Sequence, residues 1–312
     1  MTKKMTLTFI TIISALVVLL TSCGLSPSTG SSPSSGSSSG GTIIVGSKSF
    51  TENILIGDMM YDLLSANLKG VTIQNKSNLG GTQVPWNAIQ SGQIDMYTEY
   101  TGTGLVDILK QPVVQDPNQA YNIVKQQYPV KFHIDWLQPI GFNDTYAIAV
   151  PTALAQQYNL KTISDLAAVA PNLVFGAEPE YYTRPDGYSG LIKTYGLHFK
   201  STKSINVGLK YAAVGNNQVQ VLDVFSTDAQ LIQYKMVVLQ DDKSFFPPYY
   251  AAPIVREDIL SKYPQVATIL NKLAGKLDDA SMQKLNYAVD VQHQADTAVA
   301  KQFLVSIGLL SS

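Results

Sequence analysis

The sequence predicts an α/β fold, because short β-branched runs alternate with helical patterns from Thr42 onward. The alternation runs through residues 42–97 and starts again at residues 146–240. Such alternation is typical of a largely parallel sheet. We therefore expect two α/β lobes, followed by a helical tail that returns to the first lobe.

The first lobe is expected to begin with a buried strand at residues 42–46, a β-branched run that ends in glycine. Residues 49–52 (SFTE) match a capping box with Ser49 as N-cap and Glu52 reaching back. Apolar residues at every third or fourth position behind this box predict a helix. Further along, a strand is expected at residues 71–74, a helix at residues 80–90 and another strand at residues 94–97.

The second lobe is expected to contain strands at residues 146–150, 173–177 and 237–240, with a helix that starts at Ser164. From Glu257 the chain has a helical pattern. Its apolar positions are Ile259, Leu260, Val266, Ile269, Leu270, Leu273 and Leu277.

Composition excludes some functions. The 312 residues carry a formal net charge of −1, so the chain lacks the basic surface that nucleic-acid binding requires, and no nucleic-acid partner is expected. This length allows two domains of roughly 150 residues each. A single cysteine excludes an internal disulfide.

The N-terminus is typical of an export signal. Two lysines at positions 3 and 4 precede an apolar run at residues 7–20, which is shorter than the ~18 residues of a membrane helix. The sequence Leu20-Thr21-Ser22-Cys23 resembles the lipobox of bacterial lipoproteins, in which the cysteine receives a lipid. We expect a signal peptide at residues 1–22, and a lipidated Cys23 that begins a flexible Ser/Gly/Pro tether through residue 41. No later segment is apolar for long enough to span a membrane. This predicts an extracytoplasmic protein held at the cell membrane.

No catalytic or metal-binding pattern is evident. His133, His198 and His293 are far apart in the sequence and lack the spacing of metal ligands. The sequence contains no nucleophile elbow and no phosphate-binding loop. Adjacent carboxylates such as Glu178 with Glu180 are common on protein surfaces. The chain is therefore not expected to be an enzyme or to carry a cofactor.

Six segments occur in an order that resembles one family, the substrate-binding proteins of bacterial and archaeal osmoprotectant importers of the ATP-binding cassette type. They are residues 46–52 (GSKSFTE), 94–104 (IDMYTEYTGTG), 143–146 (NDTY), 175–187 (FGAEPE to RPDG), 225–228 (FSTD) and 246–249 (FPPY). The resemblance implies a type II periplasmic-binding-protein fold with the ligand in a cleft between lobes. The lobes are expected at residues 42–142 plus 248–312, and at 143–247. Permease and ATPase subunits of the importer would be separate partners.

The resemblance also implies a ligand site. The family's aromatic cage falls on Tyr100, Tyr146, Phe225 and Tyr249. A quaternary ammonium has no N–H to donate, so aromatic faces recognise its charge, each for about 0.5–2 kcal/mol. Phe225 departs from the tyrosine that the family commonly has, and it keeps the ring face while losing the hydroxyl.

The carboxylate-binding positions of the family's betaine-binding members fall on Lys48, Thr103 and Arg184. An arginine grips a carboxylate with two parallel hydrogen bonds, whereas a lysine adds a point charge. Choline-restricted relatives tend to carry aspartate at the position of Thr103. The expected ligand is therefore glycine betaine, proline betaine or carnitine. Arg184 could also pair with Glu180 without losing this role.

Four alternatives stay open. The chain could bind choline or an amino acid, although a primary ammonium normally requires an acidic residue. It could be an enzyme built on the same fold, against which the missing nucleophile and base argue. It could also be a receptor that signals to a membrane partner without feeding a transporter.

Overall fold

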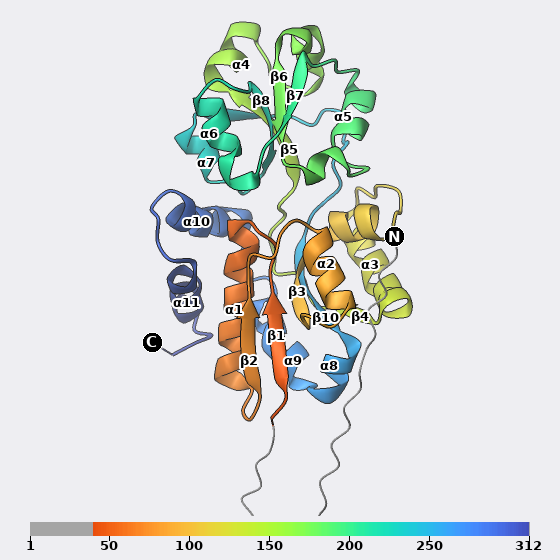
Figure 1. Ribbon diagram of the computed structural model, residues 1–312, viewed down its shortest axis with the longest axis vertical. Coiled ribbons are helices and arrows are strands. Elements are labelled where there is room, and N and C mark those ends of the chain that lie inside the picture. The colour runs from red at the N-terminus through yellow and green to blue at the C-terminus, as the bar shows by residue number, and fades with distance from the viewer. Residues whose placement is uncertain (1–39, 312) are drawn as a thin grey trace, which may run out of the picture. The chain divides into compact units, whose positions relative to one another are not determined.

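The computed structural model describes residues 40–311. The expected signal peptide, Cys23 and nearly all of the tether lie outside the described residues. Within residues 40–311 the structure contains two five-stranded sheets, each with helices packed against it (Figure 1).

The first sheet has the strand order β2-β1-β3-β10-β4. Its strands are β1 (Thr42–Gly46), β2 (Thr72–Lys76), β3 (Met96–Tyr100), β4 (Ile134–Trp136) and β10 (Ala251–Arg256). β1 runs parallel to β2 and β3, whereas β10 runs antiparallel to β3 and β4. The elements between these strands are α1 (Thr51–Asn67), α2 (Gln83–Gln90), a π-helix η1 (Thr103–Ile108) and α3 (Pro117–Phe132).

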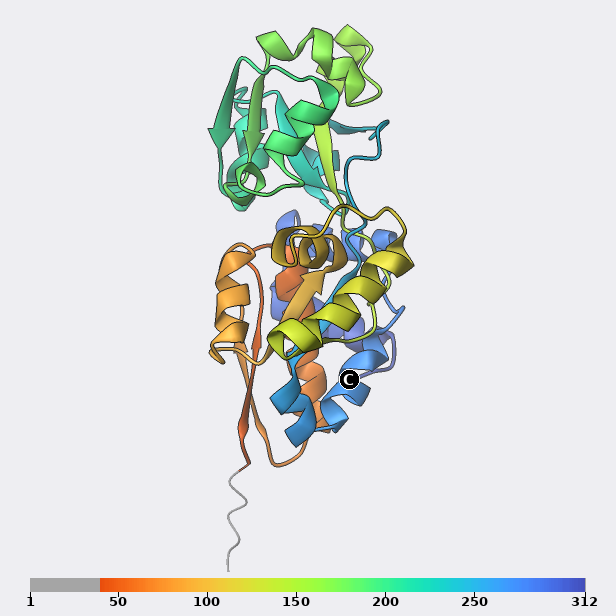
Figure 2. The ribbon, with the colours of Figure 1, turned by 90° about the vertical axis from the view of Figure 1, so that its right-hand side faces the viewer.

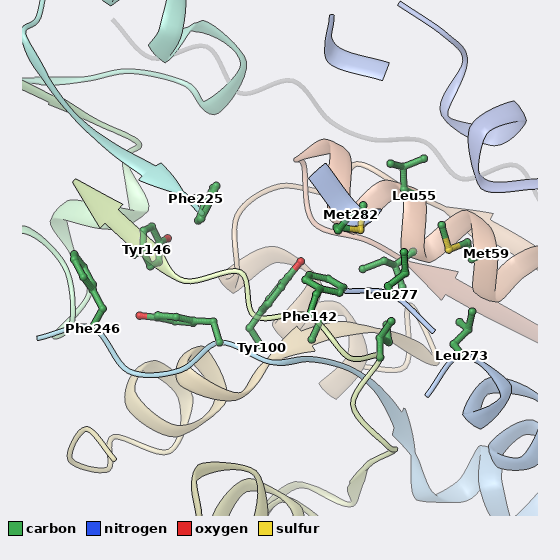
Figure 3. Packing of buried hydrophobic residues seen from close by; sticks show 14 of the residues in the cluster. Leu55, Met59, Tyr100, Phe142, Tyr146, Phe225, Phe246, Leu273, Leu277 and Met282 are labelled. Atoms are coloured by element: carbon green, nitrogen blue, oxygen red, sulfur yellow. The ribbon is translucent and has the colours of Figure 1, made fainter. Parts of the chain in front are cut away.

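The helical tail returns to this first sheet, as expected. It consists of α8 (Glu257–Lys262), α9 (Gln265–Leu270), a 3₁₀ turn η6 (Asn271–Leu273), α10 (Asp279–Asp290) and α11 (Asp296–Ser306). α1 packs against α9, α10 and α11. Figure 3 shows Leu55 and Met59 of α1 close to Met282, Leu273 and Leu277 of the tail. The aliphatic residues that predicted this helix form its buried face. They are Leu55, Ile56, Met59, Met60, Leu63 and Leu64.

The second sheet has the strand order β7-β6-β8-β5-β9. Its strands are β5 (Tyr146–Pro151), β6 (Val174–Ala177), β7 (Ser201–Ser204), β8 (Val221–Phe225) and β9 (Met236–Leu239). The helices around it are short. They are α4 (Thr152–Tyr158), α5 (Tyr188–Tyr195), α6 (Lys210–Gly215), α7 (Gln230–Gln233) and the 3₁₀ turns η2 (Ser164–Ala168), η3 (Ala170–Asn172), η4 (Glu180–Tyr182) and η5 (Val207–Leu209).

The prediction of largely parallel sheets is confirmed, because four of the five strands in each sheet point the same way. One strand in each sheet runs against the others, β10 in the first and β5 in the second. β6 runs parallel to β7 and β8, but β5 runs antiparallel to β8 and β9. The antiparallel strand of the first sheet is β10, which enters after the chain has built the second sheet. The residue pattern of one strand indicates whether that strand is buried. It does not indicate the direction in which the strand enters the sheet.

The chain crosses between the two sheets at residues 137–145 and returns at residues 240–250 (Figure 2). The two crossing segments are paired, since Asp144 N donates to Tyr249 O over 3.0 Å and Asn143 forms a bridge with Tyr250. The lobe boundaries expected at 142/143 and 247/248 fall within these segments and stay a prediction. Among residues 40–311, no helix combines the length and the apolar character needed to cross a membrane.

Candidate functional site

The four aromatic residues expected to bind ligand come from the ends of strands and from the second crossing segment. Tyr100 ends β3 and Phe225 ends β8, while Tyr146 begins β5. The β5–β8 register pairs Tyr146 directly with Phe225, so their rings lie side by side. Tyr249 lies in the second crossing segment, immediately before β10.

One pocket has all seven of the residues expected to bind ligand in its wall. It contains about 420 Å³ of empty space, part of which is open to solvent. The wall also contains residues that were not expected there, namely Ser49, Phe50, Gly81, Thr82, Asp144, Glu178, Glu180 and Val207.

Aromatic rings form a continuous series along the pocket. The ring centroids of Tyr249 and Tyr146 are 5.5 Å apart, and those of Tyr146 and Phe225 are 4.9 Å apart. Phe225 stacks on Phe50 at 5.3 Å, and Phe50 lies 5.9 Å from Tyr100. Figure 3 shows the ring of Tyr146 beside that of Phe225. Phe50 therefore joins the rings of the first lobe to those of the second.

The capping box predicted at residues 49–52 is wrong, and it obscured the role of Phe50 in the pocket. α1 begins at Thr51 with Phe50 as its N-cap, and no side chain caps this helix. The Glu52 carboxyl is held elsewhere. Its Oε1 accepts a hydrogen bond from the Tyr100 hydroxyl over 2.8 Å, and its Oε2 lies 2.6 Å from the hydroxyl oxygen of Thr227. Tertiary contacts have overridden a local pattern.

Lys48 is buried in the pocket wall and is paired with a carboxylate. Its Nζ lies 2.6 Å from Glu99 Oε1 and donates to Thr82 Oγ1 over 2.9 Å. The same nitrogen is 5.3 Å from the centre of the Tyr100 ring. Glu99 fixes Lys48 in position but also offsets its charge.

Arg184 is likewise buried and paired. Its Nε and Nη2 donate to the two oxygens of Asp186 over 2.9 and 2.7 Å, and its Nη1 donates to Glu180 over 3.2 Å. The guanidinium carbon lies 5.2 Å from the centre of the Tyr146 ring. The Tyr249 hydroxyl also donates to Asp186. The pairing with Glu180 considered from the sequence is thus present, and the stronger pairing with Asp186 was missed.

Glu180 connects the two lobes. Its Oε2 accepts a hydrogen bond from Thr82 N over 2.7 Å. A Cβ on Gly81 would lie 2.5 Å from this oxygen, so a larger residue there would displace the Glu180 carboxylate from its contact with Thr82. Burial alone would raise the pKa of Glu180, but Lys48, Arg184 and Thr82 together lower it, so the group stays ionised.

Two further carboxyl groups in the wall are Asp144 and Glu178. The Tyr146 hydroxyl donates to Glu178 Oε1 over 2.5 Å. Burial raises the pKa of both carboxyls, and the neighbouring Asp223 raises that of Glu178 further. Asp144 and Glu178 belong to two of the segments that carry the family resemblance, residues 143–146 and 175–187. Membership in these segments could have identified them as pocket residues.

Thr103 is buried at the first position of η1 and lines the same pocket. In the part of the chain that the structure describes, no three His, Cys, Asp or Glu side chains are grouped so that they could hold a metal ion.

Fold and pocket together define a two-lobed binding protein for a small ligand, and comparison with known proteins specifies the family. Residues 41–306 match the family described as the substrate binding domain of the ABC-type glycine betaine transport system, and the chain belongs to this family. The expected family and its α/β binding-protein fold are thereby confirmed.

Several curated relatives are similar over most of the chain. The ergothioneine transport permease/ergothioneine binding protein of Helicobacter pylori is 38% identical over 86% of this chain, which spans 48% of that protein's length. The carnitine transport binding protein of Listeria monocytogenes is 37% identical over 84% of this chain and 86% of its own length. The glycine-betaine-binding protein of Pseudomonas aeruginosa is 35% identical over 84% of this chain and 87% of its own.

Solved structures agree. The crystal structure of a glycine betaine/carnitine/choline ABC transporter protein superimposes with a TM-score of 0.70 at 32% identity, covering 86% of this chain and 99% of that one. A lactococcal binding protein in complex with glycine betaine has a TM-score of 0.58 at 17% identity over 85% of this chain and 96% of its own, which supports the fold alone.

Proposed function

We propose that this protein captures a quaternary-ammonium solute, such as glycine betaine, proline betaine or carnitine, for an importer whose permease and ATPase are separate subunits. The observation that carries the proposal is the series of aromatic rings from both lobes around one pocket. Such rings attract a cation that has no hydrogen to donate. The protein binds and releases its ligand unchanged, outside the cytoplasm, and Cys23 carries a lipid anchor.

In this proposal Tyr100, Tyr146, Phe225 and Tyr249 surround the trimethylammonium group, and the ligand carboxylate lies toward Lys48, Thr103 and Arg184. Phe50 adds a fifth ring, because it stacks between Tyr100 and Phe225. The lobes, divided at residues 142/143 and 247/248, close over the ligand. Because the rings come from both lobes, the ligand favours the closed arrangement.

A second candidate is a cation without a carboxylate, such as choline. The charges at the place proposed for the ligand carboxylate favour choline. Two cations, Lys48 and Arg184, are paired there with three protein carboxylates, those of Glu99, Glu180 and Asp186. A zwitterion would have to share donors that are already paired, whereas choline would meet a surplus of negative charge.

Calorimetric titration of the protein lacking residues 1–23 distinguishes these candidates. Glycine betaine, carnitine, ergothioneine, choline and glycine are added separately. Saturable binding of a trimethylated ligand without a response to glycine supports the aromatic cage. Binding of choline alone supports the second candidate, and binding of none of the trimethylated ligands contradicts both.

Thr103→Asp should weaken glycine betaine binding at least about tenfold, since the new carboxylate repels that of the ligand. Choline binding should be retained. Thr103→Asn, which is similar in size but uncharged, is the control and should change the affinity for glycine betaine much less. Unchanged glycine betaine affinity in Thr103→Asp would place the ligand carboxylate away from Thr103.

A further inference from the structure

Two buried carboxyl groups, those of Glu52 and Asp144, meet at one hydroxyl beside the ligand pocket. Thr227 Oγ1 lies 2.6 Å from Glu52 Oε2 and 2.6 Å from Asp144 Oδ1. All three side chains are buried. Both distances are those of strong hydrogen bonds, so each pair of oxygens requires a hydrogen between its atoms.

Counting hydrogens shows that one of these carboxyls is protonated. A threonine hydroxyl has one hydrogen to donate, and an ionised carboxylate has none. If both carboxyls were ionised, one of the two contacts would join two oxygens without a hydrogen, next to two like charges in a buried place. A protonated carboxyl that donates to Thr227, which in turn donates to the other carboxylate, satisfies both contacts.

Glu52 is the better position for the proton. Burial raises the pKa of the Glu52 carboxyl well above its usual range, and the charge of Asp144 raises it further. Burial also raises the pKa of Asp144, but hydrogen bonds from the Thr227 hydroxyl and backbone counteract this. Asp144 lines the ligand pocket, whereas Glu52 lies behind it.

The three residues belong to different parts of the fold. Glu52 is in the first turn of α1, Asp144 is in the first crossing segment, and Thr227 follows β8 of the second sheet. The hydrogen-bonded set is therefore complete only when the second lobe lies against α1. Without Thr227, Glu52 would face the space between the lobes and be hydrated.

We propose that Glu52 is a positioning residue that takes up a proton when the lobes close on the ligand, and that Asp144 keeps the single negative charge of the pair at the pocket wall. The identity of the ligand rests on the function proposed above. The proton comes from water, which has access through a second cavity of about 510 Å³ that is partly open to solvent and is lined by all three residues.

Other titratable groups face this pair from every neighbouring element. Tyr100 of β3 donates its hydroxyl hydrogen to Glu52, and Asp290 of α10 accepts one from Thr51 over 2.5 Å. Asp228 follows β8, and Lys210 of α6 lies 3.7 Å from Asp228. Lys210 also lies 3.8 Å from Asp223, and the Tyr211 hydroxyl of the same helix donates to Asp228 over 2.6 Å. The charge of Lys210 is thus shared by two carboxylates other than Glu52, so the surroundings add more negative than positive charge and favour a retained proton.

The direction of the pH dependence follows from linkage. The pKa of Glu52 is raised in the closed arrangement relative to a hydrated carboxyl, so closure binds a proton at any pH between these two pKa values. Ligand affinity should then be greatest at acidic pH and decrease as pH rises, by at most about tenfold per pH unit. Glycine betaine is a suitable probe, because its quaternary ammonium has no proton to lose.

Calorimetry with glycine betaine in two buffers of different ionisation enthalpy measures the proton uptake directly. The wild type should take up a proton on binding at any pH between the pKa of a hydrated glutamate and the raised pKa of Glu52 in the closed arrangement, and its affinity should fall as the pH rises through this interval. Glu52→Gln should bind with almost no uptake and little pH dependence. The glutamine amide donates to Thr227 and its oxygen accepts from Tyr100, so it reproduces the protonated carboxyl.

Asp58→Asn is the matched control. Asp58 is also a buried carboxyl of α1, and burial raises its pKa to about 6, but its hydrogen-bond partner Asn75 belongs to the same lobe. Closure does not change its surroundings, so this variant should keep the wild-type proton uptake. Asp144→Asn should instead bind more weakly at every pH, because it removes the charge at the pocket wall.

Binding without proton uptake in the wild type, or an unchanged pH dependence in Glu52→Gln, would overturn the proposal while leaving the ligand assignment intact. If no trimethylated ligand binds, the proposed function fails, and thermal unfolding still tests the proton. A raised pKa contributes stability that is lost as pH rises. The wild type should therefore lose thermal stability relative to Glu52→Gln as the pH rises above the usual pKa range of a glutamate, and parallel curves would contradict the retained proton.

Discussion

Arg184→Ala should lower the free energy of unfolding by about 3–5 kcal/mol and abolish binding of glycine betaine. The side chains of Arg184 and Asp186 are 1% and 0% exposed, and the guanidinium also binds Glu180. Its removal leaves buried carboxylates without a partner, which is the costly way to break an ion pair. Denaturant unfolding and calorimetric titration measure the two effects.

The chain contains a matched control for this variant. Arg256 donates to both oxygens of Asp258 over 2.9 and 2.7 Å, the same distances and the same two-residue spacing as in the pair of Arg184 with Asp186. The side chains of this second pair are 26% and 62% exposed. Arg256→Ala should therefore cost no more than about 1 kcal/mol and leave the ligand affinity unchanged. Equal losses in the two variants would show that burial does not govern the strength of these pairs.

Arg184→Lys distinguishes a ligand-binding role of Arg184 from a structural one. Lysine keeps the positive charge near Glu180 but cannot form the two parallel hydrogen bonds. If Arg184 contacts the ligand carboxylate, this variant should lose affinity for glycine betaine and keep it for choline. An equal loss for both ligands would restrict Arg184 to a structural role.

The strands and long helices could be predicted from the sequence because their patterns are local. The predicted strand at residues 146–150 is β5, and the apolar positions behind Glu52 form the buried face of α1. The antiparallel direction of β5 and β10 could not be predicted in this way. β10 joins the first sheet only after the chain has completed the second one, and no pattern within residues 251–256 indicates that return.

The residues of the pocket could be predicted from the sequence, but the ion pairs among them could not. All seven expected residues lie in its wall, and their binding roles stay proposals. The partners Glu99 and Asp186 stand next to expected residues in the sequence, yet only the folded backbone shows that they turn toward Lys48 and Arg184. Glu52 was assigned to a helix cap because its actual partner Thr227 is 175 residues away.

The Tyr146 ring is the second position where a large effect is expected, and its effect should differ in kind from that of Arg184. Tyr146 contacts four other rings, those of Tyr181, Phe225, Phe246 and Tyr249. Tyr146→Ala should reduce the affinity for glycine betaine and for choline by a similar factor of about 30, because both ligands present the same trimethylammonium group to the ring. Tyr146→Phe keeps the ring and should retain most of the affinity for both.

Loss of a large buried ring also destabilises the fold, so the comparison needs a ring that is buried to the same degree but lies outside the pocket. Phe175 of β6 is such a ring, since it is buried in the same sheet and also contacts four others, those of Tyr181, Tyr182, Tyr188 and Phe199. Both alanine variants should lose about 3–5 kcal/mol of unfolding stability, measured with denaturant. Only Tyr146→Ala should lose ligand affinity at a temperature where both variants are folded. If Phe175→Ala loses as much affinity, the ring of Tyr146 supports the lobe without contacting the cation, and the aromatic cage would have to be assigned to other residues of the pocket.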